Sequence, residues 1–398
     1  MTEAVRGQSW SQRILSEVLL RWGARLGIAW IGLLTLLAVF APLLANTHPL
    51  LVQDADGWRS PMLVHLGPAD TTLLGLFFLA LLLVLLPGRR LLRFLAWLGG
   101  AAVVGALSWT LVSPPALVVY EQYREAEAAG EYQRVIRAPI PYSAKDYLRD
   151  YADTGLESPR ASDERLHWFG TDENGADVLS RMVHATRIAL SIGFIATGIA
   201  LAIGVVLGGL MGYFSGIIDI IGMRLVEIFE AIPTLFLLLT FVAFFGRSLY
   251  LMMLIIGLTS WSGYARYVRA EFLRLRQQDF VQGAIASGLS LPSILFRHML
   301  PNGMAPILVA ASFGVASAIL AEATLSFLGL GLIDDPSWGQ MLNQAVQSST
   351  FNWWMAAFPG SAIFLTVFAY NLIGEALRDA VDPHAQSGRP ALPAKAAG

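Results

Sequence analysis

Cysteine is absent from this sequence of 398 residues, and charged residues are scarce. Without cysteine the chain can form no disulfide, no thiol nucleophile and no thiolate metal site. Charged residues make up 14% of the chain and hydrophobic residues 55%, whereas a soluble domain carries about a quarter charged residues. This deficit of charge predicts an integral membrane protein.

Lysine is also rare, because Lys145 and Lys395 are the only two in the chain. Neither lies in the Gly-x-x-x-x-Gly-Lys-Ser/Thr pattern, whose glycine-rich loop holds nucleotide phosphates. If ATP drives this protein, another chain must hydrolyse it. The net charge of −2 and the lack of a basic run interleaved with aromatic residues argue against nucleic acid as a partner.

Catalytic and metal-binding patterns are missing as well. His167, His184 and His298 are isolated in the sequence, and no His-Glu-x-x-His pair occurs. No serine lies in a Gly-x-Ser-x-Gly turn. We therefore expect no catalytic residues, no bound cofactor and no metal site in this chain.

Long apolar runs are what the sequence does have. A helix needs about 20 mostly apolar residues to cross a membrane, and eight stretches meet that requirement. The predicted spans are Leu26–Ala45, Thr71–Pro87, Leu91–Val112, Ile188–Tyr213, Ile228–Phe245, Leu249–Ala265, Gly303–Ala321 and Trp354–Glu375. Residues 1–25 are expected to form an amphipathic cytoplasmic segment. They lack the apolar core and cleavage site of a signal peptide, so the first span, 26–45, is expected to remain as an anchor.

The arginines predict how the spans are oriented. They gather before the first span, at the turn between the second and third spans, and around residues 266–302. Because positively charged loops stay in the cytoplasm, all three groups fall on one side if the N-terminus is cytoplasmic and there are eight spans. The tail, 379–398, is then cytoplasmic too. Removing residues 71–112 leaves every other segment on its side, so these residues are interpreted as an inserted transmembrane hairpin. The predicted fold is an all-α integral membrane protein with a six-helix core, of which residues 187–378 form the main domain.

Two long segments are expected on the extracytoplasmic side of the membrane. The first, 113–186, contains the stretch 120–151, in which charges alternate with tyrosines until Pro139 and Pro141 interrupt the helical spacing. It is either a small folded cap or a flexible connector. The second, 324–352, is rich in turn residues and is expected to pack on the mouth of the helix bundle.

Four carboxylates lie close to predicted spans, and a charge within a membrane marks a functional candidate by default. Glu227 and Glu230 open the fifth span, Glu322 ends the seventh and Glu375 ends the eighth. Their places near span ends favour headgroup contact or pairing with nearby arginines over a proton relay. A secondary transporter would more often carry carboxylates in the middle of its spans.

The segment between the sixth and seventh spans differs from its surroundings. Residues 270–288 predict a helix that ends at Gly288, and Ser290 with Pro292 predicts the start of a second short helix that ends near residues 300–301. The first helix carries small residues close together, which would let another surface approach. The segment is either a docking site or an amphipathic helix that lies at the membrane interface.

This segment resembles the cytoplasmic "EAA" loop in the membrane subunits of binding-protein-dependent ABC importers. The family pattern is Glu-Ala-Ala, three residues, Gly, nine residues, then Ile-x-Leu-Pro, and the spacing here fits in full. The residues at the positions of the pattern are Gln282, Gly283, Ala284, Gly288, His298, Leu300 and Pro301. Gln282, Gly283 and His298 depart from the pattern, where the family has Glu, Ala and Ile.

Two further motifs resemble the dipeptide and oligopeptide branch of that family, in its C-type subunit. One is FGTDENGADVLSR at 169–181, with Ala176 in place of a usual arginine, and the other is ATLSFLGLG at 323–331 followed by PSWG at 336–339. The residues expected to face a binding protein are Gly170, Thr171, Asp172, Gly175, Asp177, Arg181, Gly329, Gly331, Trp338 and Gly339. The resemblance covers residues 166–383 and the first span, but not residues 70–165.

The resemblance implies a permease subunit in a bacterial inner membrane, which imports peptides or peptide-like solutes. It implies a second homologous permease chain, two ATP-binding subunits that hydrolyse ATP, and an extracytoplasmic solute-binding protein as partners. The EAA loop would couple this chain to the ATP-binding subunits. Two other functions stay open, which are a secondary transporter or channel without an ATPase, and a membrane scaffold or receptor.

Overall fold

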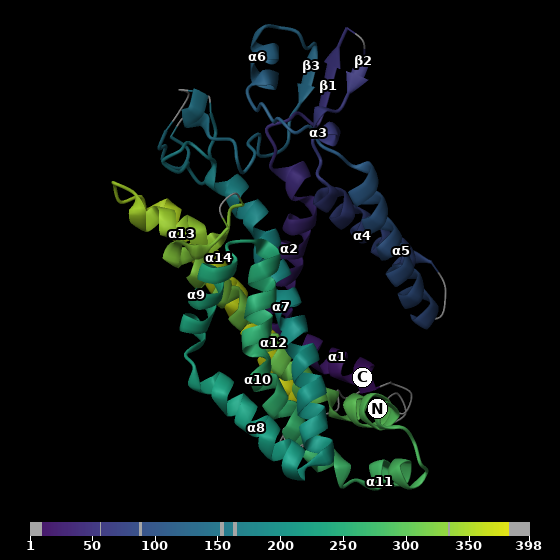
Figure 1. Ribbon diagram of the computed structural model, residues 1–398. Helices are drawn as coiled ribbons and strands as arrows, with labels where there is room; N and C mark the ends of the chain where they lie inside the picture. Colours follow the sequence, from purple (N-terminus) through teal and green to yellow (C-terminus); the bar gives the residue numbers. More distant parts are fainter. Residues whose placement is uncertain are drawn as a thin grey trace, which may run out of the picture. The chain divides into compact units, whose positions relative to one another are not determined.

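The computed structural model describes residues 10–55, 57–86, 90–151, 155–161, 165–332 and 335–381. Their fold is helical apart from one small sheet, and the chain divides into two compact units (Figure 1). Unit 1 takes its residues from 1–32, 190–325 and 362–398, and unit 2 from 33–189 and 326–361. The predicted segments 1–25 and 379–398 lie partly outside the described residues.

Unit 1 contains α1 (Trp10–Leu20) and most of the chain between residues 190 and 325. Its remaining helices are α8 (Gly216–Ala231), α9 (Thr234–Phe245), α10 (Leu249–Arg276), α11 (Asp279–Ala286), the π-helix η2 (Ser293–Met299) and α12 (Leu300–Leu325). Helices α2 (Trp22–Leu44), α7 (Val178–Phe214) and α14 (Trp353–Val381) contribute residues to both units.

Six helical stretches in the described part are long and apolar enough to span a membrane. They are α2, α4 (Pro68–Leu85), α5 with residues Leu91–Leu111, α7, the continuous stretch Ser293–Leu330, and α14. Helices α8 and α9 would form a seventh span if they are taken together, and the predicted span Leu249–Ala265 lies inside α10, which is not among the six. The chain is therefore a multi-pass helical membrane protein, but a count of eight spans is not confirmed.

The prediction of one continuous span over Ile228–Phe245 is wrong. The chain breaks after α8, and α9 leaves at an angle of 81°. Pro233 causes the break, because proline has no backbone N–H to continue a helix and its ring forces the preceding residue out of the helical region. Ile232 accordingly has φ −86° and ψ 123°, which is extended backbone.

Helix α10 is the centre of unit 1, since it packs against α8, α9, α11 and α12. It also meets α7 along a stripe of three glycines spaced four residues apart. A Cβ at Gly204, Gly208 or Gly212 would lie 2.5, 2.3 or 2.6 Å from the nearest atom of α10. Small residues at this spacing let two membrane helices approach backbone to backbone. The stripe therefore sets the distance between α7 and α10.

Ion pairs join α8 to α10. The carboxylate of Asp219 accepts hydrogen bonds from the Arg269 guanidinium, one of them at 2.6 Å, and Glu230 pairs with Arg266. Glu227 pairs with Arg224 on α8 itself. The expected pairing of these carboxylates with nearby arginines is confirmed for Glu227 and Glu230, whereas Glu322 is buried with 2% of its surface exposed.

Unit 2 contains a small folded cap that is built around a three-stranded antiparallel sheet in the order β2-β1-β3. Strands β1 (Leu51–Asp54), β2 (Gly57–Arg59) and β3 (Arg134–Ile136) pair with Val52 opposite both Arg59 and Val135. The short helices α3 (Pro61–Val64), α6 (Gln122–Ala128) and η1 (Leu148–Tyr151) complete this region. Of the two alternatives for residues 113–186, a folded cap is found. Strands β1 and β2, which precede the hairpin, were not expected.

Polar contacts hold the cap together. The buried carboxylate of Asp146 accepts a hydrogen bond from the Thr47 hydroxyl at 2.5 Å and pairs with Arg124 at 2.7 Å. The ring of His48 stacks on that of His65 with centroids 3.8 Å apart. Burial and the neighbouring His65 lower the pKa of His48 to about 4, so His48 is neutral at physiological pH.

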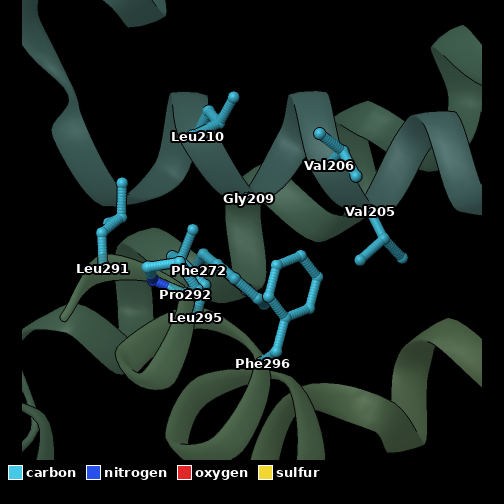
Figure 2. Close-up of a pocket in the computed structure, with 9 residues that line it drawn as sticks. All are labelled: Val205, Val206, Gly209, Leu210, Phe272, Leu291, Pro292, Leu295 and Phe296. Carbon is cyan, nitrogen blue, oxygen red and sulfur yellow. The ribbon is translucent and has the colours of Figure 1, made fainter.

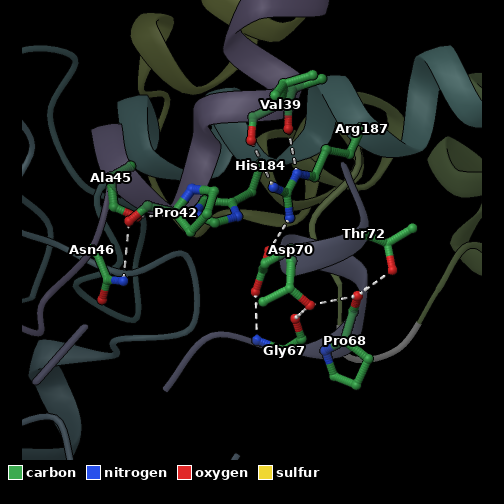
Figure 3. Close-up of polar contacts among 12 residues, drawn as sticks. Val39, Pro42, Ala45, Asn46, Gly67, Pro68, Asp70, Thr72, His184 and Arg187 are labelled. Atoms are coloured by element: carbon green, nitrogen blue, oxygen red, sulfur yellow. Dashed lines mark hydrogen bonds and ion pairs between the residues drawn. The ribbon is translucent and has the colours of Figure 1, made fainter. Parts of the chain in front are cut away.

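Helices α4 and α5 (Arg90–Leu111) pack on each other as the predicted hairpin. Arg187 of α7 ties the start of α4 to α2 (Figure 3). Its guanidinium pairs with Asp70 and donates to the carbonyl oxygens of Ala38 and Val39, the latter at 3.3 Å. Asp70 also accepts from the backbone N–H of Gly67 at 2.8 Å. One arginine therefore connects three helices of unit 2.

The glycine stripe leads to a stability prediction. Gly208→Ala would place a methyl group against the Ala265 carbonyl, a backbone atom that cannot move aside. Overpacking of this kind typically costs about 1–3 kcal/mol. We expect a lower melting temperature for the purified variant in detergent. Gly198→Ala is the control, because a Cβ at Gly198 meets no atom within 4 Å, and equal melting temperatures for the two variants would contradict the role of the stripe.

Candidate functional site

The connection between α10 and α12 forms the first candidate site. Helix α10 ends at Arg276, Gln278 is extended with φ −79° and ψ 144°, and α11 runs from Asp279 to Ala286. Residues 270–288 were predicted as one helix, and that prediction is wrong because this extended residue separates two helices. Gly288 follows α11 with φ +72°, a left-handed conformation that glycine adopts readily at a helix end. The predicted end of the helix at Gly288 is thus confirmed.

The second short helix was expected to end near Leu300-Pro301, and this is wrong as well. Residues 291–325 are helical throughout, with the π-helix η2 immediately before α12. A π-type turn relaxes the regular hydrogen-bond ladder, and local π adjustments of this kind accommodate a proline such as Pro301 inside a membrane helix. The chain therefore enters α12 without a break.

One side of α11 packs against the other helices of unit 1. Val281 and Ala284 are 0% and 7% exposed and belong to a buried apolar cluster. The cluster also includes Val268, Phe272 and Leu275 of α10, Ile294, Leu295 and Met299 of η2, and Ile307 of α12. Because these side chains interlock, α11 is held to the ends of both long helices.

The other side of α11 is open. Phe280, Ile285 and Leu289 are 43%, 37% and 41% exposed. A Cβ at Gly283 would meet no atom within 4 Å, so nothing in unit 1 requires glycine there. Of the small residues in the EAA-like pattern, Gly283 and Gly288 therefore face outward, while Ala284 is turned toward the core.

Gln282 fills a specific position. Its side-chain N–H donates to the carbonyl oxygen of Arg276 at 2.7 Å, one of the last carbonyls of α10, which have no partner within the helix. A carboxylate cannot make this bond, because it has no hydrogen to donate. The remaining members of the pattern lie on the following helix, where His298 and Leu300 are partly buried and Pro301 is exposed.

An apolar groove lies beside this connection (Figure 2). It has a volume of about 150 Å³. Its walls are Val205, Val206, Gly209 and Leu210 of α7, Phe272 of α10, and Leu291, Pro292, Leu295 and Phe296. The side chain of Phe296 is 49% exposed at the rim.

The motif at 169–181 forms a second candidate site, in unit 2, and its residues are mostly buried. Gly170 has φ +74°, and a Cβ there would lie 2.7 Å from the Glu157 carbonyl and 2.8 Å from the Trp354 indole nitrogen. That indole donates to the Thr171 carbonyl at 3.0 Å. Only glycine fits at this position, because both the conformation and the space exclude a side chain.

The acidic residues of the motif hold the start of α7. Asp177 accepts from the Ser180 backbone N–H at 2.7 Å and from the His167 ring at 2.8 Å. Asp172 pairs with Arg181, which is 3% exposed. An aspartate in the Asp177 position is a typical helix N-cap, and it explains why α7 begins at Val178 and not at the predicted Ile188.

The outer-loop motif is partly buried, with Phe327 and Leu328 exposed. Trp338 begins α13 (Trp338–Gln347), is 2% exposed, and donates to the Met182 carbonyl at 3.4 Å. Gly339 and Gly331 are buried, and Gly329 has φ +80° within the π-helix η3 (Ser326–Leu330). Trp338 and Gly331 contact other residues of unit 2, and contact of this motif with a binding protein stays a prediction.

Exposed groups lie close to these motifs along the chain. Phe351 is 88% exposed, Val346 71% and Trp353 52%. Glu173 accepts from the Ser348 hydroxyl at 2.7 Å and the Ser349 backbone at 2.9 Å, and these hydrogen bonds lower the pKa of its carboxyl. Phe351 and Trp353 have no distinguishing signal in the sequence, since single aromatic residues near a span are common.

Metal ligands do not cluster in the described part of the chain, where no three or more His, Asp or Glu side chains are placed to hold an ion. The observed features are thus a set of apolar helices long enough to span a membrane several times and a loop with one anchored and one open face. This is the architecture of a multi-pass helical membrane protein.

Sequence comparison identifies the family. Residues 204–387 match the family described as "Binding-protein-dependent transport system inner membrane component". The dipeptide transport system permease protein DppC of Alkalihalophilus pseudofirmus is 39% identical over 253 residues, which are 63% of this chain and 82% of that protein. The chain belongs to this family of inner membrane permease components of binding-protein-dependent ABC importers.

Other relatives agree with that assignment. The oligopeptide transport system permease protein OppC of Escherichia coli (strain K12) is 38% identical over 63% of this chain and 82% of its own length. The glutathione transport system permease protein GsiD of Pectobacterium atrosepticum is 39% identical over 62% of this chain and 81% of its own length. Among solved structures, the inward-facing MetNI methionine ABC transporter matches 51% of this chain and 98% of its own, with 19% identity and a TM-score of 0.43.

The hydrogen bond of Gln282 can be tested directly. Gln282→Glu removes the donor and places a negative charge at the C-terminal end of α10, which the helix dipole disfavours. Loss of one such bond costs about 1 kcal/mol. We expect backbone amides 279–281 to exchange hydrogen about fivefold faster, measured by mass spectrometry on the purified protein.

The matched control is Gln277→Glu. It introduces the same charge five residues earlier, at the exposed C-cap residue of α10. If both variants accelerate exchange equally, charge and not the hydrogen bond of Gln282 explains the effect.

Proposed function

We propose that this chain is one of two permease subunits of an ATP-driven importer for peptides or peptide-like solutes in the bacterial inner membrane. Family membership and the dipeptide, oligopeptide and glutathione systems of its relatives support this. A second homologous permease completes the route through the membrane. Two ATP-binding subunits hydrolyse ATP, and an extracytoplasmic binding protein delivers the solute, so this chain carries no cofactor.

Coupling to the ATP-binding subunits occurs at α11. The supporting observation is that α11 combines an anchored face with an open face, since Val281 and Ala284 are buried while Phe280 and Ile285 are exposed. A partner can approach closely at Gly283, where even an added methyl group would meet no atom of this chain within 4 Å. Exposed apolar groups around a small residue suit insertion into a groove on another protein.

Movement of α11 reaches the membrane through α10. Val281 of α11 lies in one buried cluster with Phe272 of α10 and Met299 of η2. Packed interiors transmit displacement because they have few voids in which to absorb it. When the ATP-binding subunits close, α11 is carried with them, and α10 and α12 tilt to open the route on the other side.

Both termini are placed in the cytoplasm with α11. The arginine pattern supports this, as does the ion pair between Arg21, which precedes α2, and Asp379 of α14. In Figure 1 the α1 segment lies toward the α11 end of unit 1. Residues 113–186 and 324–352 then face the binding protein, through exposed groups such as Phe351 and Val346 and not through the buried motif residues.

Experiment can distinguish two alternative functions from this proposal. A secondary transporter or channel would move solute in liposomes from this chain alone under an ion gradient. A scaffold or receptor would bind a partner at α11 without accumulating solute. ATP-dependent uptake by vesicles that contain both permeases, the ATP-binding subunits and the binding protein eliminates both.

The docking role predicts the effect of one substitution. Gly283→Leu adds bulk to the open face of α11 without touching this chain, so the permease folds but the partner cannot approach. We expect at least a tenfold loss of co-purifying ATP-binding subunits and of solute-stimulated ATP hydrolysis. Gly288 is a poorer choice, because its φ of +72° strains any other residue.

Gly32→Leu is the control for Gly283→Leu. Gly32 lies in α2, and a Cβ there likewise meets no atom within 4 Å. Normal co-purification and hydrolysis in both variants would overturn the docking role of α11.

A further inference from the structure

A cavity of about 500 Å³ opens on the surface of unit 1 between α7, α9, α10 and α12, and Ser260, Tyr267 and Ser317 of its lining are exposed. This volume falls within the range of about 300–1,000 Å³ that is typical of small-molecule sites. The lining residues named below all belong to these four helices. Neither the EAA-like loop nor the outer motifs contribute to it.

Hydroxyl groups come into this cavity from all four helices. The residues that carry them are Thr197 of α7, Thr234 of α9, Ser260, Tyr264 and Tyr267 of α10, and Ser317 of α12. None of the described residues that line the cavity is charged. A hydroxyl both donates and accepts hydrogen bonds, so the wall can pair with an amide N–H as well as with a carbonyl oxygen.

The break between α8 and α9 opens onto the same cavity. Thr234 is the first residue of α9, directly after Pro233. Non-helical backbone at membrane depth is tolerated where it lines a cavity that holds water or solute, and transporters place substrate sites at such broken helices. Pro233 causes the 81° bend, and the bend in turn places the start of α9 at the wall of the cavity.

Small residues keep the cavity open. A Cβ at Gly263 would meet no atom within 4 Å, so the space in front of this residue is empty. At Gly314, a Cβ would lie 1.5 Å from the Tyr264 hydroxyl oxygen. Glycine at 314 thus allows the Tyr264 ring to lie across the wall with its hydroxyl beside α12.

We propose that this cavity is a solute-holding site within the permease, which recognises the backbone amides of a peptide and does not read the charge of its side chains. The proposal rests on the proposed function as an importer of peptides. The hydroxyls orient the peptide by hydrogen bonding to its backbone. Because the described lining carries no charge, it neither repels charged side chains of the solute nor binds them tightly. Weak binding of this kind lets the solute leave, as conduction requires.

The first test fills the cavity. Gly263→Phe places a ring in the empty space in front of α10, while Gly198→Phe adds the same ring at an exposed residue of α7 that does not line the cavity. Both variants are assembled into the complete complex in liposomes. We expect at least a tenfold loss of tripeptide uptake in Gly263→Phe only, with co-purification of the ATP-binding subunits unchanged in both.

The second test adds a charge. Ser260→Asp should reduce uptake of an acidic tripeptide at least tenfold relative to a basic one, while Ser260→Asn, of the same size but neutral, should transport both equally. Unchanged uptake in Gly263→Phe together with unchanged preference in Ser260→Asp overturns the site. Failure of the wild-type complex to import any peptide with ATP instead defeats the proposed function, so the two failures are distinguishable.

Discussion

The close contact between α7 and α10 is the constraint on which the rest of unit 1 depends. Gly204, Gly208 and Gly212 let the two backbones meet at distances that no side chain permits. In lipid there is no hydrophobic force to hold helices together, so packing of this kind supplies the stability. It also brings Thr197 of α7 and Tyr264 of α10 together as neighbours in the lining of one cavity.

Helix α10 joins the proposed coupling loop to the proposed solute site. Ile256, Ser260, Gly263, Tyr264 and Tyr267 of α10 line the cavity, and the last turn of α10 is followed directly by the connection to α11. No proline or positive φ interrupts α10 over its 28 residues. A helix without such a break moves as one body, so a displacement at α11 changes the cavity wall. This physical link connects the proposed coupling loop with the proposed solute site.

The sequence predicted the apolar runs and the family correctly because both depend on local patterns. Span length and the spacing of the EAA-like residues can be recognised without tertiary information. The break at Pro233 has a local signal too, since a proline in a helical run disfavours its continuation. The apolar residues on both sides of Pro233 nevertheless led to the prediction of one continuous span. The stripe Gly204, Gly208 and Gly212 was visible as a repeat of four, but only the structure supplies the helix that it contacts.

Other features could not be predicted. Strands β1 and β3 are separated by the whole hairpin, and three or four residues are too few for a recognisable period. The burial of Asp172 and Trp338 follows from their contacts with Arg181 and Met182, which spacing alone does not reveal. The cavity is formed by four helices, so no single stretch of sequence contains it.

The most direct measurement uses the natural absence of cysteine. Ser260→Cys gives this chain one thiol, on the cavity wall, in a complex whose other subunits are resolved by mass on a gel. Its labelling rate by a water-soluble maleimide is compared between nucleotide-free complex and complex trapped with ATP and vanadate. We expect a change of at least tenfold in that rate, because closure at α11 tilts α10. Equal rates in the two states would contradict the link between coupling loop and cavity.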